Sequence, residues 1–252
     1  MAISIAMIAL GPGAKLSLPA MQRDLTTTWP DLPAVGNVAR KDRMFAFTIG
    51  DLDVIVKHVP EPIPWQDLEG PCAASWLWPD AANVLQTHKT HFIVTVHGEV
   101  APIERARLLT QTTAATLAAC PAALGVYWES AALVLPTATF RGYAKDLLRV
   151  APPVYIWVDF RVSQQPDGSA AGYTRGLAPL GLMEIEAPAA LEPPGELRER
   201  LISLASYVLQ MGAVIQDGDT VSEDTSGPVR VVHAPSSFGF AGRVMRLKYL
   251  DR

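Results

Sequence analysis

The chain has 252 residues, of which 49% are hydrophobic and 18% charged, and its formal net charge at pH 7 is −4. This length suits one large domain or two small ones, with a core that needs no disulfide or metal. The mean hydropathy of +0.18 excludes a disordered chain. The acidic balance argues against general nucleic-acid binding, which needs a basic surface.

Cysteine usage and hydropathy predict where the protein resides. Cys72 and Cys120 belong to no Cys-x-x-Cys motif, so no zinc-knuckle or redox motif is present. An isolated pair of cysteines is typical of buried thiols in a reducing compartment. The apolar residues 1–10 lack a basic segment and a cleavage site, and no later segment has about 18 consecutive apolar residues. We therefore predict a cytoplasmic protein that does not associate with a membrane.

Hydrophobic periodicity, together with proline and glycine positions, predicts the elements of the first half. In chain order these are a strand at 2–10, a helix at 19–28, a loop at 31–42, strands at 44–49 and 52–59, a helix at 78–88 and a strand at 91–97. Prolines 60, 62 and 64 end the third strand, since proline donates no ladder hydrogen bond. This element order is typical of a ferredoxin-like βαββαβ unit.

The second half is predicted to repeat this order after an intervening helix. Its elements are a helix at 102–120, a strand at 124–128, a helix that follows 133–136 and runs to about 149, strands at 154–162 and 180–187, a helix at 194–211 and strands at 229–234 and 244–250. Leu-x-Leu-Pro occurs at both 16–19 and 133–136. The alternative is that short apolar motifs coincide by chance in an α+β chain.

An ungapped internal match favours duplication over chance. Residues 49–62 align with 180–193, so that Asp53 matches Glu184. We therefore predict an α+β fold, a tandem duplication of a ferredoxin-like unit with antiparallel sheets and helices on one face. The predicted division is a first half at 1–100, a connecting helix at 101–121 and a second half at 122–252, packed as one compact unit.

Four segments resemble a known family. They are IGDLDVIVKHVPEPIPW at 49–65, WPDAANVLQTHKTHFIVTVHGE at 78–99, GVYWES at 125–130 and LGLMEIE at 180–186. Together they resemble the bacterial domain of unknown function 4261 family over nearly the whole chain. The resemblance implies a bacterial cytosolic protein and no catalytic residue. It also suggests relatives near toxin-delivery or toxin–immunity systems.

Strand parity places polar side chains on the sheet faces that the helices leave open. His91 shares a face with Thr95 and His97, and Tyr155 and Trp157 share a face with the polar side chains at 159 and 161. If the two halves face each other, Asp53 and Glu184 approach, and paired carboxylates perform acid–base chemistry because repulsion splits their pKa values. The alternative is that each acid is ion-paired or solvated at a strand edge.

Histidines and tryptophans give two further hypotheses. His88 and His91 are metal-ligand types, but no third ligand lies at a suitable spacing, so we predict no metal and no cofactor. Trp65 follows rigid prolines in a loop, and aromatic anchors are favoured at protein interfaces. We therefore predict that Trp65 contacts a partner, whereas Trp76 and Trp78 cover the sheet edge.

Two functions from different classes remain open. The first is a non-enzymatic module that binds another protein, because the sequence contains no nucleophile elbow or phosphate loop. The second is a small enzyme or ligand-binding protein with a pocket between the two sheets, formed by Asp53, Glu184 and Tyr155. An enzyme should show a concave pocket of about 300 Å³ or more with convergent polar groups, and a binder a flat aromatic patch. The sequence does not decide the partner, the substrate or the oligomeric state.

Overall fold

A computed structural model describes residues 2–224 and 227–249. The chain divides into two compact units, unit 1 at Met1–Ile156 and unit 2 at Trp157–Arg252, and each is considered by itself. The predicted division at 101–121 differs from this boundary. The reason is that the helix there, α4 (Pro102–Ala118), contacts strands of unit 1 and is an integral part of it.

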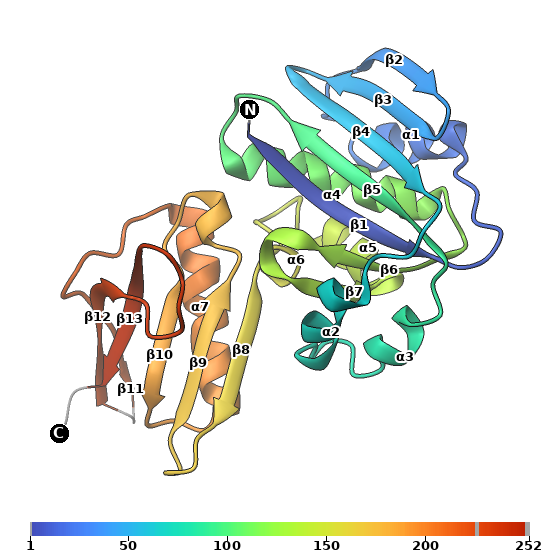
Figure 1. The fold of residues 1–252 in the computed structure, drawn as a ribbon. Coiled ribbons are helices and arrows are strands. Elements are labelled where there is room, and N and C mark those ends of the chain that lie inside the picture. Colours follow the sequence, from blue (N-terminus) through green and yellow to red (C-terminus); the bar gives the residue numbers. More distant parts are fainter. Residues whose placement is uncertain (1, 225–226, 250–252) are drawn as a thin grey trace. The chain divides into compact units, whose positions relative to one another are not determined.

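Unit 1 contains a seven-stranded antiparallel sheet (Figure 1). Its strands are β1 (Ile3–Leu10), β2 (Val35–Lys41), β3 (Met44–Ile49), β4 (Leu52–Val59), β5 (Thr90–His97), β6 (Ala123–Trp128) and β7 (Leu133–Pro136). Their order across the sheet is β2-β3-β4-β5-β1-β6-β7. β1 is therefore an interior strand, as its apolar sequence predicts. The connection from β1 through α1 to β2 passes over three strands, and the connection from β5 through α4 to β6 passes over one.

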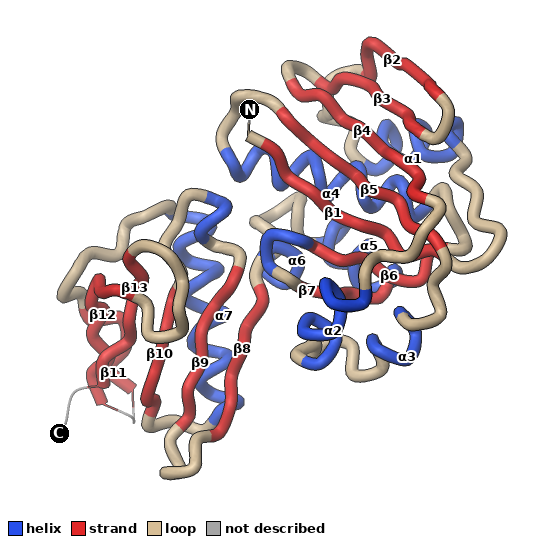
Figure 2. The backbone as a smooth tube through the Cα atoms, in the orientation of Figure 1, coloured by secondary structure: helices blue, strands red, loops and turns tan. Residues whose placement is uncertain are grey.

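Helices cover both faces of this sheet. They are α1 (Leu18–Thr28), α2 (Trp65–Ala73), α3 (Ala81–Leu85), α4, α5 (Thr137–Asp146) and the short α6 (Val154–Trp157), with a 3₁₀ turn at Glu129–Ala131. α4 contacts β1 and β5 and also α1 and α5. In Figure 2, α4 lies behind the strands of this sheet. α2 and α3 pack instead on Ala9 and Val134. Met7, two residues before Ala9 on β1, packs against the same cluster, so α2 and α3 cover the face of β1 on which these two side chains lie.

Most predicted elements of unit 1 are confirmed, and four are wrong. The predicted loop at 31–42 contains β2, the proline-rich loop contains α2, and the helix at 78–88 is only Ala81–Leu85. The predicted strand at 154–162 begins instead as α6. Its first turn follows two prolines, and the Ile156 N–H donates to the Pro153 carbonyl at 2.9 Å.

Unit 2 contains a six-stranded mixed sheet. Its strands are β8 (Asp159–Gln164), β9 (Ala170–Arg175), β10 (Ile185–Ala190), β11 (Thr220–Asp224), β12 (Gly227–Pro235) and β13 (Arg243–Tyr249). Their order is β11-β12-β13-β10-β9-β8, with β10 and β13 parallel. The helix α7 (Pro194–Met211) has the predicted bounds and packs on β8, β9 and β10, and a 3₁₀ turn at Ala178–Leu180 precedes β10.

The loop between β12 and β13 lies over the face opposite α7. The Ser237 N–H donates to Glu186 at 2.8 Å, and the rings of Phe238 and Phe240 contact Tyr173 at centroid distances of 4.8 and 5.3 Å. Gly172, the neighbour of Tyr173, faces Leu197 of α7. Tyr173 and Glu186 therefore point to the opposite side.

The predicted tandem duplication is not confirmed. Unit 2 has the order strand, strand, strand, helix, strand, strand, strand, with one long helix. Of the two segments aligned in sequence, 52–59 forms β4 between two antiparallel neighbours. The other begins as a 3₁₀ turn and forms β10, which has a parallel neighbour. The coarser prediction, an α+β fold with largely antiparallel sheets, is confirmed.

Candidate functional site

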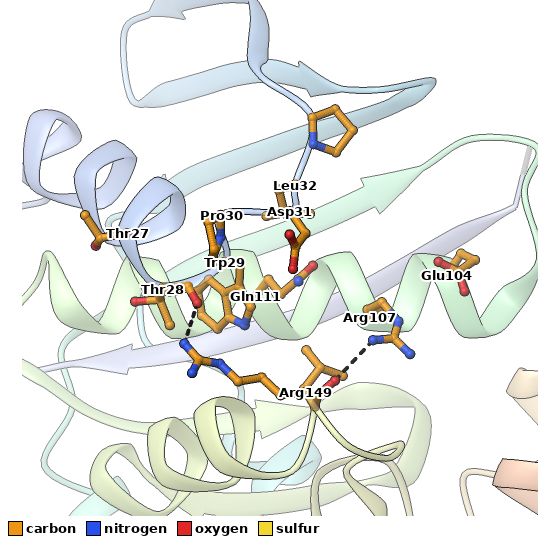
Figure 3. A pocket seen from close by; sticks show the side chains of 12 residues that line it. Thr27, Thr28, Trp29, Pro30, Asp31, Leu32, Glu104, Arg107, Gln111 and Arg149 are labelled. Atoms are coloured by element: carbon orange, nitrogen blue, oxygen red, sulfur yellow. Dashed lines mark hydrogen bonds between the residues drawn. The ribbon is translucent and has the colours of Figure 1, made fainter.

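The largest described cavity lies in unit 1, between the end of α1, the N-terminal half of α4 and the segment after α5 (Figure 3). Its volume is about 620 Å³. Its lining residues are Thr27, Thr28, Trp29, Pro30, Asp31, Leu32, Pro33, Glu104, Arg107, Gln111, Leu148 and Arg149. We call it the α1–α4 pocket. Its volume lies within the range of small-molecule sites.

Two arginines fix the walls of the α1–α4 pocket. Arg149 donates from Nη2 to the carbonyl of Thr28 at 2.8 Å, where α1 ends. Arg107 donates from Nη1 to the carbonyl of Leu148 at 3.1 Å. Both carbonyls lie where helix or loop backbone lacks an intrahelical partner. Each guanidinium has five N–H groups, so these bonds leave further donors for a ligand.

Two buried polar side chains of the pocket have no hydrogen-bond partner among the described residues. Trp29 is 5% exposed and Gln111 is 6% exposed. The indole Nε1 and the amide Oε1 are both buried and unpartnered. Leaving such a group unsatisfied costs about 1–3 kcal/mol. Thr112 and Thr113 of the same helix are also unpartnered, but they do not line the pocket.

Opposite charges meet in the α1–α4 pocket. Asp31 is exposed in the loop after α1, and Glu104 is in the first turn of α4. Among the described lining residues, neither forms an ion pair with Arg107 or Arg149. Figure 3 shows Asp31 and Arg149 on opposite sides of Gln111. The pocket therefore offers both cationic donors and anionic acceptors.

The predicted site residues Asp53, His91 and Trp65 all lie in unit 1 but in different surroundings. Asp53 is exposed on β4, and its Oδ2 is 3.7 Å from His97 Nδ1. His91 is buried, and its Nδ1 lies 2.7 Å from the carbonyl oxygen of Glu61. Trp65 is the first residue of α2 and packs, half-buried, against a cluster that includes Leu68. The structure thus anchors Trp65 on a helix, whereas the sequence predicted a loop.

Tyr155 and Trp157 do not share a strand face. They lie in α6, where Tyr155 stacks on Tyr143 at 5.2 Å and meets Trp76 edge-on at 6.3 Å. Trp157 is fully buried. The prediction of one face with Asp159 and Arg161 is wrong because a helical turn rotates successive side chains by about 100°, not 180°.

Glu184 is a buried carboxylate with three donors inside unit 2. Its Oε1 accepts from the N–H groups of Gly176 and Ala178 at 2.8 and 3.0 Å, and its Oε2 accepts from Thr174 Oγ1 at 2.7 Å. Burial raises the pKa of Glu184, and these hydrogen bonds oppose the rise. Neither Glu184 nor Asp53 nor Tyr155 lines any of the five described cavities. The predicted pairing of Asp53 with Glu184 stays a hypothesis.

His88 and His91 bind backbone. The Ile63 N–H donates to His88 Nε2 at 2.7 Å, and both rings thus hold the segment 61–63. Within residues 2–224 and 227–249, no three His, Cys, Asp or Glu side chains are grouped to hold a metal ion. No helix in the described part of the chain has the length and hydropathy of a membrane span.

The residues of the α1–α4 pocket were not identified from the sequence. One signal was present: Glu104, Arg107 and Gln111 lie three and seven residues apart on a helix otherwise rich in Ala, Thr and Leu. Such spacing places polar side chains on one helical face. The other lining residues come from 27–33 and 148–149. No local pattern links these segments to the helix.

Comparisons with known proteins bear on unit 2. The structure defines an α+β protein of two units, each built on one sheet with packed helices. The family model "Domain of unknown function (DUF4261)" matches residues 173–248, so the resemblance is confirmed over this part of the chain. Of the four segments that suggested it, only 180–186 lies within the match. No curated protein matches the chain, and no solved structure matches it.

Proposed function

We propose that the protein binds a small polar molecule in the α1–α4 pocket. The observation that carries this proposal is a cavity of about 620 Å³ whose wall contains two buried, unpartnered polar groups, Trp29 Nε1 and Gln111 Oε1. No described hydrogen bond engages Gln111 Oε1, so this acceptor is available to a donor of the ligand. By the criterion of a concave pocket with convergent polar groups, this favours ligand binding. The proposed pocket lies on the helical face of unit 1, whereas the sequence predicted a pocket between the two sheets.

The charges of the pocket suit a small zwitterion such as a free amino acid. Arg107 and Arg149 keep unused guanidinium donors, which match a carboxylate in a bidentate geometry. Asp31 and Glu104 supply acceptors for an ammonium group. A ligand of one sign would leave one of these pairs unmatched, and unmatched charge lowers affinity.

Ligand-detected NMR with a mixture of the standard amino acids tests this proposal. We expect at least one amino acid to bind with a Kd of about 1 mM or tighter, or about −4 kcal/mol. Gln111→Leu and Arg149→Met should each weaken it about tenfold by removing a polar contact. Arg23→Met, exposed on α1 outside the pocket, is the matched control. Absence of binding, or equal loss in the control, contradicts the proposal.

A second candidate function is protein binding through unit 2. Three large side chains in the last two turns of α7 and just after it are exposed, with Tyr207 at 48%, Met211 at 59% and Val214 at 43%. Tyr207 and Val214 also line a groove of about 350 Å³ together with Leu204 and Val221 of β11. Exposed apolar side chains beside a groove are typical of interaction sites. This α7 groove lies inside the residues that match the family model.

Affinity capture from the source cells tests the second candidate. Tyr207→Ser combined with Met211→Ser should abolish capture of a specific protein, because it removes the apolar contact area. Leu191→Ser is the control, since Leu191 is 66% exposed but precedes α7. A partner that binds both variants equally well rules out the α7 groove as its site.

We further propose that unit 1 contains a ferredoxin-like arrangement and that the protein is bacterial and cytoplasmic. Strands β4-β5-β1-β6 with the crossings through α1 and α4 support one ferredoxin-like arrangement in unit 1. Cys72 and Cys120 are free and buried, which supports a cytoplasmic location. The family resemblance supports a bacterial origin and a link to toxin–immunity systems. Identifying the genes that flank the coding sequence would test the bacterial origin and the link to toxin–immunity systems.

A further inference from the structure

Two hollows flank the turn between β2 and β3, and five cationic side chains line them. Their volumes are about 350 and 500 Å³. The cationic residues are Lys15, Arg40, Lys41, Arg43 and Lys57, and the acidic ones are Asp42 and Glu61. None of the five cations has an ion pair or a side-chain hydrogen bond among the described residues. The lining of the two hollows thus has a net positive charge in a chain of net charge −4.

His58 lies where the two hollows meet. It lines both, as does Arg43. Its ring contacts Phe92 at a centroid distance of 5.4 Å. Neither ring nitrogen makes a hydrogen bond within the part of the chain that the structure describes, and Nε2 is buried. Burial, and then the charge of Arg43, lower the pKa of His58. An unpaired imidazole beside unpaired cations suits an anionic ligand.

The smaller hollow also has an apolar floor. Phe45, Val56 and Phe92 are almost fully buried and line it, and Leu16 and Leu18 join them from the start of α1. Its rim carries Lys15, Arg40 and Arg43. An apolar floor below a cationic rim matches a molecule with a hydrocarbon body and one strongly anionic group. Its small volume favours a small molecule over a nucleic-acid strand.

We propose that this hollow binds a small phosphorylated molecule, with its phosphate between Lys15, Arg43 and His58 and its apolar part against Phe92. A phosphate offers three acceptor oxygens, and lysine and arginine are the side chains that bind it best. A carboxylate would engage fewer of these donors. The site shares no lining residue with the α1–α4 pocket. Its test is therefore independent of the test of the function proposed above.

NMR of the His58 ring protons tests this site, with phenyl phosphate, inorganic phosphate and benzoate as probes at constant ionic strength. His58→Gln assigns the signal. We expect a saturable shift with phenyl phosphate, weaker binding of inorganic phosphate and weakest binding of benzoate. We also expect the pKa of His58 to rise in the complex, because the phosphate charge opposes that of Arg43.

Charge variants separate a specific site from general attraction. Lys15→Ala and Arg43→Ala should each weaken phenyl phosphate binding about tenfold. Lys145→Ala removes the same charge from the exposed surface of α5, outside both hollows, and should leave the affinity unchanged. None of the three positions is buried, so the variants should fold. Absence of a saturable His58 shift overturns the proposal, as does equal weakening by Lys145→Ala.

Discussion

His88 accepts a hydrogen bond at Nε2 from the backbone N–H of Ile63, 2.7 Å away. Because Nε2 accepts, the proton of the neutral ring is on Nδ1, which donates to the carbonyl of Leu85. His91 holds the same segment through the carbonyl of Glu61. Two imidazoles thus fix the proline-rich strap 60–64 to the sheet and to α3.

We expect acid to weaken this strap. The pKa of His91 is lowered, chiefly by burial, against the opposing effect of its hydrogen bond to Glu61. The unfolded chain therefore takes up a proton near pH 6.5 while the folded chain resists it. The free energy of unfolding should fall as the pH drops below about 6.5, until the folded-state pKa is reached.

Urea denaturation between pH 7.5 and 5 measures this dependence. His91→Gln keeps an N–H donor for Glu61 without a titrating ring, so its stability should fall less on acidification. Identical pH slopes in wild type and variant would show that His91 does not titrate in this range.

Gly125 of β6 should not tolerate a side chain. A Cβ at this position would lie 2.5 Å from Cη2 of Trp78 and 3.1 Å from the carbonyl oxygen of Leu135. Trp78 is buried in the cluster beneath α2 and α3, so neither neighbour yields easily. We expect Gly125→Ala to destabilise the protein by about 1–3 kcal/mol through overpacking.

Thermal denaturation of Gly125→Ala checks this expectation against Gly142→Ala. Gly142 lies in α5, where an added Cβ would meet no atom within 4 Å, and alanine there should stabilise the helix slightly. A loss of stability in both variants, or in neither, would contradict the argument from Trp78.

Glu184 should show the opposite pH dependence to His91. Burial raises its folded-state pKa above the usual 4.5. Between pH 4.5 and this folded-state pKa, Glu184 therefore keeps its proton in the folded chain, whereas the unfolded chain has released it. The contribution to stability should therefore decline as the pH rises from about 4.5 to the folded-state pKa. Glu184→Gln should remove this decline, as measured by urea denaturation from pH 4 to 7.

Glu184→Ala separates the hydrogen bonds from the charge. It leaves the donors of Gly176, Ala178 and Thr174 without an acceptor, and we expect a loss of at least about 2 kcal/mol. A smaller loss than that of Glu184→Gln at pH 7 would show that the carboxylate does not organise this loop.

Elements with a strong hydrophobic pattern and clear end signals were predicted correctly from the sequence. α7, with its apolar stripe and Gly212 beyond its end, has the predicted bounds. β2 was missed because it is an edge strand with mostly exposed side chains, and only pairing with β3 makes it a strand. α6 was read as a strand because Tyr155 and Trp157 alternate with apolar residues, and the preceding prolines outweigh that alternation.

The candidate site was less accessible to sequence reasoning. Trp29, Gln111 and Arg149 lie on three separate segments, and only the packing of α1 and α5 on α4 brings them to one cavity. Conversely, Asp53 and Glu184 were paired through a sequence match that the strand topology does not support. Local patterns specify elements, but a pocket depends on long-range contacts that no single pattern encodes.

Glu192 should prove the most sensitive carboxylate of unit 2. It is buried just before α7, and its Oε1 accepts from Arg200 Nε of α7 and from the Tyr249 hydroxyl of β13, both at 2.7 Å. Burial, and then Glu192, raise the pKa of Tyr249, so the hydroxyl stays a donor. Removing one member of a buried ion pair costs about 3–5 kcal/mol, and we expect Glu192→Ala to reach that range. Tyr249→Phe should cost about 1.5–3 kcal/mol.

In a double-mutant cycle by urea denaturation, the double variant should lose less than the sum of the two single losses, since both remove the same bond. Strict additivity would show that Glu192 and Tyr249 contribute to stability independently.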